Sequence, residues 1–164
     1  MSAEREVLTW PTFGAAVREL AEQVVAGGFV PDVVVAIARG GLVPGGAMAY
    51  ALGTKGVGTM NVEFYTDVGE TLPDPVMLAP SMDATDLRNS RVLVVDDVAD
   101  SGRTLDLVMR TITEHGAEVR SAVIYTKPHS IVRPDFSWRE TDLWITFPWS
   151  AEPPVPGARA RPAD

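Results

Sequence analysis

Short apolar runs and segments with helical periodicity follow one another along this chain. Residues 32–38 (DVVVAIA) and 91–95 (RVLVV) are almost entirely apolar and rich in β-branched side chains. Such runs are typical of strands that are buried on both faces of a parallel sheet. Further strands are predicted at residues 59–64, 119–125 and 143–147.

Three helices are predicted around these strands. The first has Thr12 as a possible N-cap and Gly27-Gly28 at its end. A short helix is expected at about residues 44–52, and a third starts after Thr104 and ends at Gly116. Strands that alternate with helices predict an α/β fold. The apolar residues at helical spacing are Phe13, Ala16, Val17, Leu20 and Val24 in the first helix and Leu105, Val108, Met109 and Ile112 in the third.

Two segments lack this periodicity. Residues 65–89 contain three prolines and are rich in carboxylates, and they are predicted to form a long loop, which in a compact domain is usually functional or mobile. From residue 152 the chain has four prolines and no apolar pattern, which is typical of disorder. We therefore expect one domain over residues 1–151 and a disordered tail over residues 152–164.

The composition limits the environment and the partners of the protein. There is no cysteine and there are only two histidines, so disulfides and thiolate metal sites are excluded. A net charge of -8 disfavours nucleic acid as a partner, because such binding relies on Lys and Arg at the phosphates. The sequence shows no secretion signal and no run of about 18 apolar residues. We expect a cytoplasmic protein that binds neither nucleic acid nor membranes.

Acidic residues follow directly after the second apolar run. In an open α/β sheet the ligand binds beyond the carboxyl ends of the strands, so these positions form the candidate site. Asp96, Asp97 and Asp100 lie within five positions of one another. Three carboxylates this close repel each other unless a cation or a hydroxylated ligand engages them. Magnesium or a sugar meets this requirement.

The next four residues, 101–104 (SGRT), open a helix. Free backbone N–H groups at a helix N-terminus suit a phosphate, and Gly102 lets the backbone come close to it. Taken singly, an Asp pair at a strand end is a common turn and Ser or Thr a common N-cap. The complete string instead indicates a sugar-phosphate site. A nicotinamide-binding Rossmann fold is excluded because no Gly-x-Gly-x-x-Gly follows the first strand.

Residues 94–104 (VVDDVADSGRT) resemble the motif that binds phosphoribosyl pyrophosphate (PRPP) in type I phosphoribosyltransferases. Within that family the chain is most similar to the bacterial xanthine-guanine enzymes. The similar segments are residues 8–10 (LTW), 37–45 (IARGGLVPG), 127–128 (KP) and 142–149 (DLWITFPW).

This resemblance implies a central, mostly parallel sheet flanked by helices, with a small hood formed by the two chain ends. It implies a glycosyltransferase that moves ribose 5-phosphate from PRPP to a 6-oxopurine (guanine, xanthine or hypoxanthine) in purine salvage. It also implies Mg²⁺ as cofactor and a homo-oligomeric assembly. Pyrophosphate would be the second product.

The resemblance further assigns a role to each candidate residue. Asp96 and Asp97 would hold the ribose hydroxyls, with Asp97 also near the metal, and Asp100 would accept the proton that the base sheds. The remaining contacts are Arg39 and Gly40 to pyrophosphate, Ser101, Gly102, Arg103 and Thr104 to the 5-phosphate, and Lys127, Trp144 and Ile145 to the base. Lys127 would donate to O6, Trp144 would stack and Ile145 would offer its main chain.

The chain departs from the family pattern in three places that bear on function, one of which is Ala38, where the similar enzymes often have serine. Between residues 59 and 90 only Arg88 is basic, whereas related enzymes place a basic residue in the loop that closes over pyrophosphate. Arg103 stands where glycine is common. Two alternatives therefore stay open: a phosphoribosyltransferase for another base, such as a pyrimidine, and a non-catalytic regulator that senses PRPP. His129 follows Lys127-Pro128 and is therefore a neighbour of the predicted base pocket, but the sequence alone assigns it no role.

Overall fold

The computed structural model of the chain describes residues 3–65, 71–78 and 84–158. Its elements, in chain order, are β1 (Arg5–Val7), α1 (Trp10–Ala26), β2 (Val33–Ala38), α2 (Leu42–Leu52), β3 (Gly56–Tyr65), β4 (Thr71–Met77), the 3₁₀ helix η1 (Ala84–Leu87), β5 (Arg91–Ala99), α3 (Arg103–Glu114), β6 (Glu118–Thr126), β7 (Phe136–Glu140) and β8 (Trp144–Thr146).

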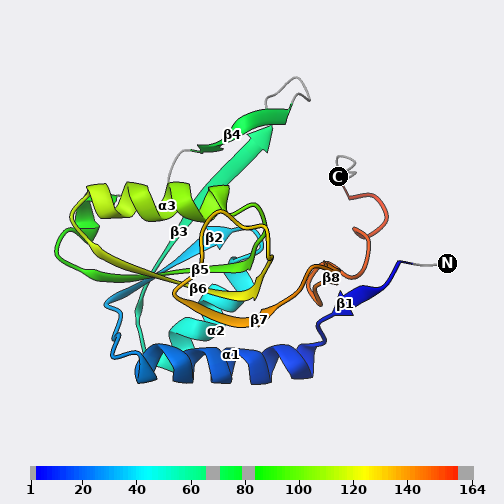
Figure 1. Cartoon of the computed structure of the whole chain (residues 1–164), viewed down its shortest axis with the longest axis horizontal. Helices are drawn as coiled ribbons and strands as arrows, with labels where there is room; N and C mark the ends of the chain where they lie inside the picture. Colours follow the sequence, from blue (N-terminus) through cyan, green and yellow to red (C-terminus); the bar gives the residue numbers. More distant parts are fainter. Residues whose placement is uncertain (1–2, 66–70, 79–83, 159–164) are drawn as a thin grey trace.

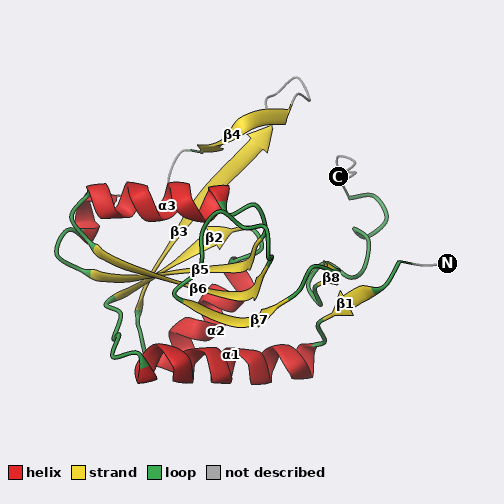
Figure 2. Cartoon of the chain, viewed as in Figure 1, coloured by secondary structure: helices red, strands yellow, loops and turns green. Residues whose placement is uncertain are grey.

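A six-stranded sheet with the order β4-β3-β2-β5-β6-β7 forms the centre of the molecule. Neighbouring strands are parallel except for β3 and β4, which run antiparallel. Helix α3 covers one face, while α1 and α2 cover the other (Figure 1, Figure 2). The expected α/β fold with a mostly parallel sheet is thus confirmed.

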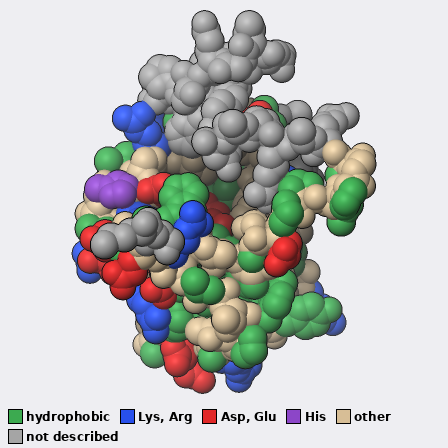
Figure 3. Space-filling model, turned by 90° about the vertical axis from the view of Figure 1, so that its right-hand side faces the viewer, with side chains coloured by type: hydrophobic (Ala, Val, Ile, Leu, Met, Phe, Trp, Pro, Cys, Tyr) green, Lys and Arg blue, Asp and Glu red, His purple; other side chains and the backbone are tan. Residues whose placement is uncertain are grey.

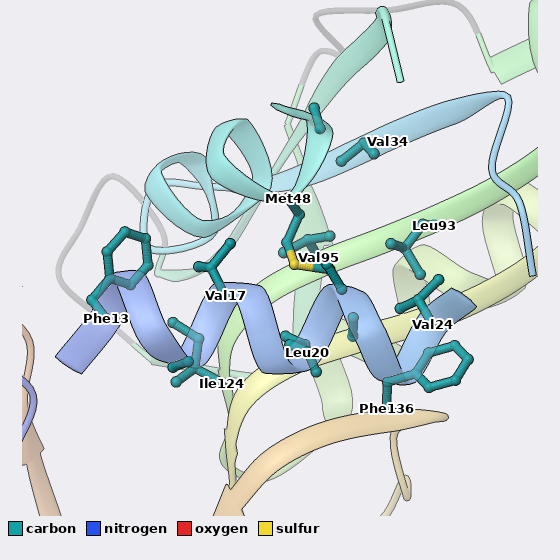
Figure 4. Close-up of a cluster of buried hydrophobic side chains, with 14 of the residues drawn as sticks. Phe13, Val17, Leu20, Val24, Val34, Met48, Leu93, Val95, Ile124 and Phe136 are labelled. Carbon is teal, nitrogen blue, oxygen red and sulfur yellow. The ribbon is translucent and has the colours of Figure 1, made fainter. Parts of the chain in front are cut away.

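Alternate residues of β5 enter two separate hydrophobic cores. Leu93 and Val95 pack on the side of α1 and α2 (Figure 4), whereas Val92 and Val94 pack on the side of α3. All four side chains are fully buried. This two-sided burial is the reason for the uninterrupted apolar run in the sequence, and it anchors the first half of β5 in the sheet.

The first helix begins earlier than its predicted cap. Thr9, not Thr12, is the N-cap, and its hydroxyl accepts a hydrogen bond from the backbone N–H of Thr12 at 3.3 Å. Pro11 fits in the first turn because the N–H it lacks would have no helical partner there. The predicted apolar stripe is confirmed, since all five of its residues are buried.

Several strands differ from the sequence prediction. The segment 65–89 was expected to be a loop, but it contains β4, which pairs with β3 at the sheet edge. Pro73 and Pro75 are compatible with this place because only one side of an edge strand is hydrogen-bonded. Residues 66–70 and 79–83 of the segment lie outside the described residues. The prediction also missed β1 and β7, and it ended β5 four residues too early.

A second, two-stranded sheet stands apart from the main one (Figure 1). In it β1 pairs in parallel with β8, and Arg5 lies opposite Trp144. Phe147 and Trp149 stack with ring centroids 5.0 Å apart, and Phe13 of α1 meets Trp149 edge-on at 5.4 Å. This sheet corresponds to the expected hood, and the aromatic contacts attach it to α1. In the described part of the chain, every helix is too short or too polar to span a bilayer.

Candidate functional site

The parallel arrangement brings the predicted site residues to one edge of the sheet. β2, β5 and β6 are neighbours, and their registers place Ala36 opposite Val95 and Asp96 opposite Val123. The segments that follow these strands therefore meet beneath the hood. Figure 3 shows the molecule from the right-hand side of Figure 1, and on this surface carboxylates, cationic side chains and a histidine lie together.

Asp96 and Asp97 form a half-buried acidic pair at the end of β5. The backbone N–H of Asp97 donates to Asp96 Oδ1 at 2.9 Å, and the N–H of Val98 donates to Asp97 Oδ1 at 2.7 Å. Burial raises the pKa of the Asp96 carboxyl well above its usual range, and the neighbouring Asp97 charge raises it further. Burial also raises the pKa of Asp97. A cation or sugar hydroxyls beside this pair would relieve the cost of its ionisation.

The loop after β2 packs directly on this pair. The Ala38–Arg39 peptide bond is cis, and Gly40 lies against the carboxylate of Asp97. A methyl group added at Gly40 would lie only 2.6 Å from Asp97 Cγ. A side chain at this position would therefore separate the loop from the acidic pair. Arg39 is exposed.

The segment after the acidic pair forms a turn at the start of α3. Gly102 has φ +82°, and a Cβ there would lie 2.9 Å from the backbone nitrogen of Val132. The Ser101 hydroxyl accepts a hydrogen bond from the Arg103 N–H at 3.3 Å. This turn borders a cavity of about 160 Å³ whose polar lining comes from Asp96, Asp100, Ser101, Gly102 and Thr104. Its size and its place at a helix N-terminus suit one phosphate group.

A larger cavity of about 360 Å³ lies between the sheet edge and the hood. Lys127, Trp144 and Ile145 line it together with Asp100 and Val98, which also line the smaller cavity. Lys127 is buried and its Nζ donates to the carbonyl of Leu143, while Trp144 is 65% exposed. A flat ring bound here would therefore find a stacking face and a cation beside a carboxylate.

Two residues of this region were not assigned a role from the sequence. His129 Nε2 lies 2.9 Å from Asp100 Oδ1, and Arg5 lines the larger cavity from β1. The position of His129, two residues after Lys127, was the one available signal. The sequence contains no signal for Arg5, because its position in the cavity wall depends on the pairing of two strands that are more than 130 residues apart.

The structure brings most of the predicted residues together around the two cavities. Neither cavity is lined by Arg39, Gly40, Asp97 or Arg103. Gly40 and Asp97 nevertheless touch each other beside Asp96. Magnesium is compatible with this donor set, because the ion typically binds through one or two carboxylates together with substrate phosphates.

The chain matches the model of the phosphoribosyl transferase domain over residues 4–155. It belongs to this family. Over 94% of its length it is similar to the crystal structure of a purine phosphoribosyltransferase from Pyrococcus horikoshii, with 34% identity, a TM-score of 0.77 and 99% of that chain covered.

Two relatives of known name are xanthine-guanine phosphoribosyltransferases. The chain is 37% identical over 100 residues to a xanthine-guanine phosphoribosyltransferase from Cereibacter sphaeroides, covering 60% of this chain and 56% of that protein. A protein of the same name from Ruegeria is 32% identical over 108 residues, covering 62% of this chain and 58% of that protein. The matched part thus spans little more than half the length of these relatives.

Proposed function

We propose that this protein is a glycosyltransferase that transfers ribose 5-phosphate from PRPP to a 6-oxopurine and releases pyrophosphate. The observation that carries the proposal is the position of Asp100, which forms a wall common to the two cavities. A sugar phosphate in the smaller cavity and a base in the larger one would meet at this residue. The names of the similar proteins support a purine as the base.

In this proposal the chain supplies position and charge. The turn at residues 101–104 holds the 5-phosphate, Asp96 and Asp97 hold the ribose hydroxyls, and the loop at Arg39 and Gly40 receives pyrophosphate. Mg²⁺, held by Asp97, would supply positive charge for the leaving diphosphate. Preorganised groups of this kind act where charge develops during the reaction.

The base would be oriented by three contacts in the larger cavity. Lys127 donates to O6, Trp144 stacks on the ring and the main chain of Ile145 meets the opposite edge. A ring nitrogen then forms a bond with the anomeric carbon as the bond from that carbon to pyrophosphate breaks. The proton lost by the base passes to Asp100, which acts as the general base.

The test is to incubate the protein with PRPP, Mg²⁺ and, separately, guanine, xanthine, hypoxanthine, adenine or uracil, while pyrophosphate release is recorded. Turnover with a 6-oxopurine supports the proposal. Turnover with uracil alone would favour a pyrimidine enzyme, and PRPP binding without turnover on any base would favour a regulator.

Purine salvage in the cytoplasm, self-association and the disordered tail at residues 152–164 stay predictions.

A further inference from the structure

His129 forms the one hydrogen bond that the described residues offer to the Asp100 carboxylate. The distance from His129 Nε2 to Asp100 Oδ1 is 2.9 Å. Since an ionised carboxylate only accepts, the ring N–H is the donor. Both side chains are 66% exposed, so the pair adds little to the stability of the fold. The contact between His129 and Asp100 therefore bears on the geometry of the site rather than on folding.

The histidine approaches Asp100 from outside the cavities. Asp100 lines both of them, whereas His129 lines neither. The imidazole engages Oδ1 and leaves Oδ2 for a ligand. An aspartate without this contact could turn about its side-chain bonds, and the oxygen that has to receive a proton would spend less time facing the base.

The segment that carries His129 is itself fixed to both sides of Asp100. The N–H of Lys127 donates to the Ala99 carbonyl at 3.0 Å, and the N–H of Ile131 donates to the Ser101 carbonyl at 2.9 Å. Ser130 closes a turn by donating its N–H to the Lys127 carbonyl at 3.1 Å. His129 is thus held at a set position relative to the carboxylate.

We propose that His129 is a positioning residue, which holds the Asp100 carboxylate in the orientation that accepts the proton of the base. The inference rests on the proposed phosphoribosyl transfer. It assigns to the segment after β6 a second task besides presenting Lys127. His129 lines neither cavity and so would touch neither substrate.

The experiment compares His129→Ala with the wild-type protein and with Asp100→Asn under single turnover, using radiolabelled PRPP so that slow rates are measurable. His129→Ala should lower the rate about tenfold, less than the roughly 100-fold or greater loss expected for Asp100→Asn. The KM for PRPP, measured separately at steady state, should stay unchanged, because the phosphate contacts are intact. In the Asp100→Asn background, removal of His129 should cause no further loss.

Two further variants separate positioning from a general structural role. His129→Gln keeps an N–H donor at similar reach and should restore most of the rate. His115→Ala removes the other histidine, which contacts the Thr111 carbonyl within α3, and should leave the rate unchanged. Thermal unfolding of each variant checks that the fold is retained.

The outcomes distinguish this inference from the proposed function. If the wild-type protein releases pyrophosphate and His129→Ala matches its rate, the positioning role is wrong and the proposed function stands. A raised KM for PRPP at unchanged rate, or losses that multiply in the double variant, would also overturn it. If the wild-type protein turns over no base at all, both proposals fail together.

Discussion

The ionised carboxylates of Asp96 and Asp97 suit the proposed ligand but reduce the stability of the fold. Both carboxyls have raised pKa values because burial disfavours their charged form. A raised pKa means that the folded protein prefers the protonated carboxyl, so the ionised pair reduces stability at neutral pH. As the pH falls and the pair becomes protonated, this destabilisation disappears. A ligand or cation that binds the ionised pair would offset this loss of stability.

Asp97→Asn should therefore stabilise the protein and impair its site. The amide oxygen can still accept the hydrogen bond from Val98, while the buried charge is gone. We expect the free energy of unfolding to rise by about 1 kcal/mol, and Mg²⁺-dependent PRPP binding to be lost. Urea unfolding at pH 7 and calorimetric titration measure the two effects. Asp142→Asn, at an exposed carboxylate, serves as control and should change neither quantity.

Gly40→Ala should disturb the contact between the loop after β2 and the acidic pair. Its new methyl group would meet the Asp97 carboxylate, and overpacking of this kind costs about 1–3 kcal/mol. Gly46 in α2 is the matched control, because a methyl group there meets nothing within 4 Å and an alanine should stabilise the helix by about 0.5–1 kcal/mol. Equal stability of the two variants in urea would show that the loop yields freely.

The elements that the sequence predicted well are those buried by the main sheet. β2 and β5 have apolar side chains on both faces, so their pattern reports burial whatever the surroundings. The strands that were missed lie at edges or in the hood. In β7 only Phe136 is buried, and β1 has three residues, so neither leaves a periodic signal. Their pairing is decided by tertiary contacts.

One of these contacts joins the hood to the main sheet. The hydroxyl of Tyr125 in β6 donates to Glu6 Oε1 of β1 at 3.0 Å, and Arg139 of β7 pairs with the same oxygen at 3.1 Å. The Tyr125 ring is fully buried. Burial, strengthened by the nearby Glu6 carboxylate, raises the pKa of the phenol above its usual value of about 10.

This shift predicts an alkaline weakness of the fold. Above pH 10 the unfolded chain loses the Tyr125 proton before the folded chain does, so stability falls as pH rises. By pH 11 the wild-type protein should have lost about 1 kcal/mol through this group. Tyr125→Phe should remove that part of the pH dependence in urea unfolding. Tyr50→Phe, at a side chain that is 93% exposed, should retain it; parallel curves for all three proteins would contradict the assignment.

At the scale of the whole molecule, the site exists because segments distant in sequence converge. The acidic string and the turn behind it could be found in the sequence, since they are contiguous and follow a strand whose burial is plain from its pattern. The contact between Gly40 and Asp97 depends on the β2–β5 register, and that between His129 and Asp100 on the loop after β6. Arg5 reaches the larger cavity through the β1–β8 pairing. No local pattern encodes such approaches.

This convergence makes ligand binding a property of the folded state alone, so PRPP with Mg²⁺ should stabilise the whole domain. At a ligand concentration 100 times the dissociation constant, linkage gives about 2.7 kcal/mol. For a domain of this size that corresponds to a rise in Tm of roughly 5–10 °C. Differential scanning calorimetry measures it, with Asp97→Asn as the variant in which the metal-dependent rise should disappear. A rise of equal size in that variant would place the diphosphate away from the acidic pair, because a ligand held there cannot lose a carboxylate without losing affinity.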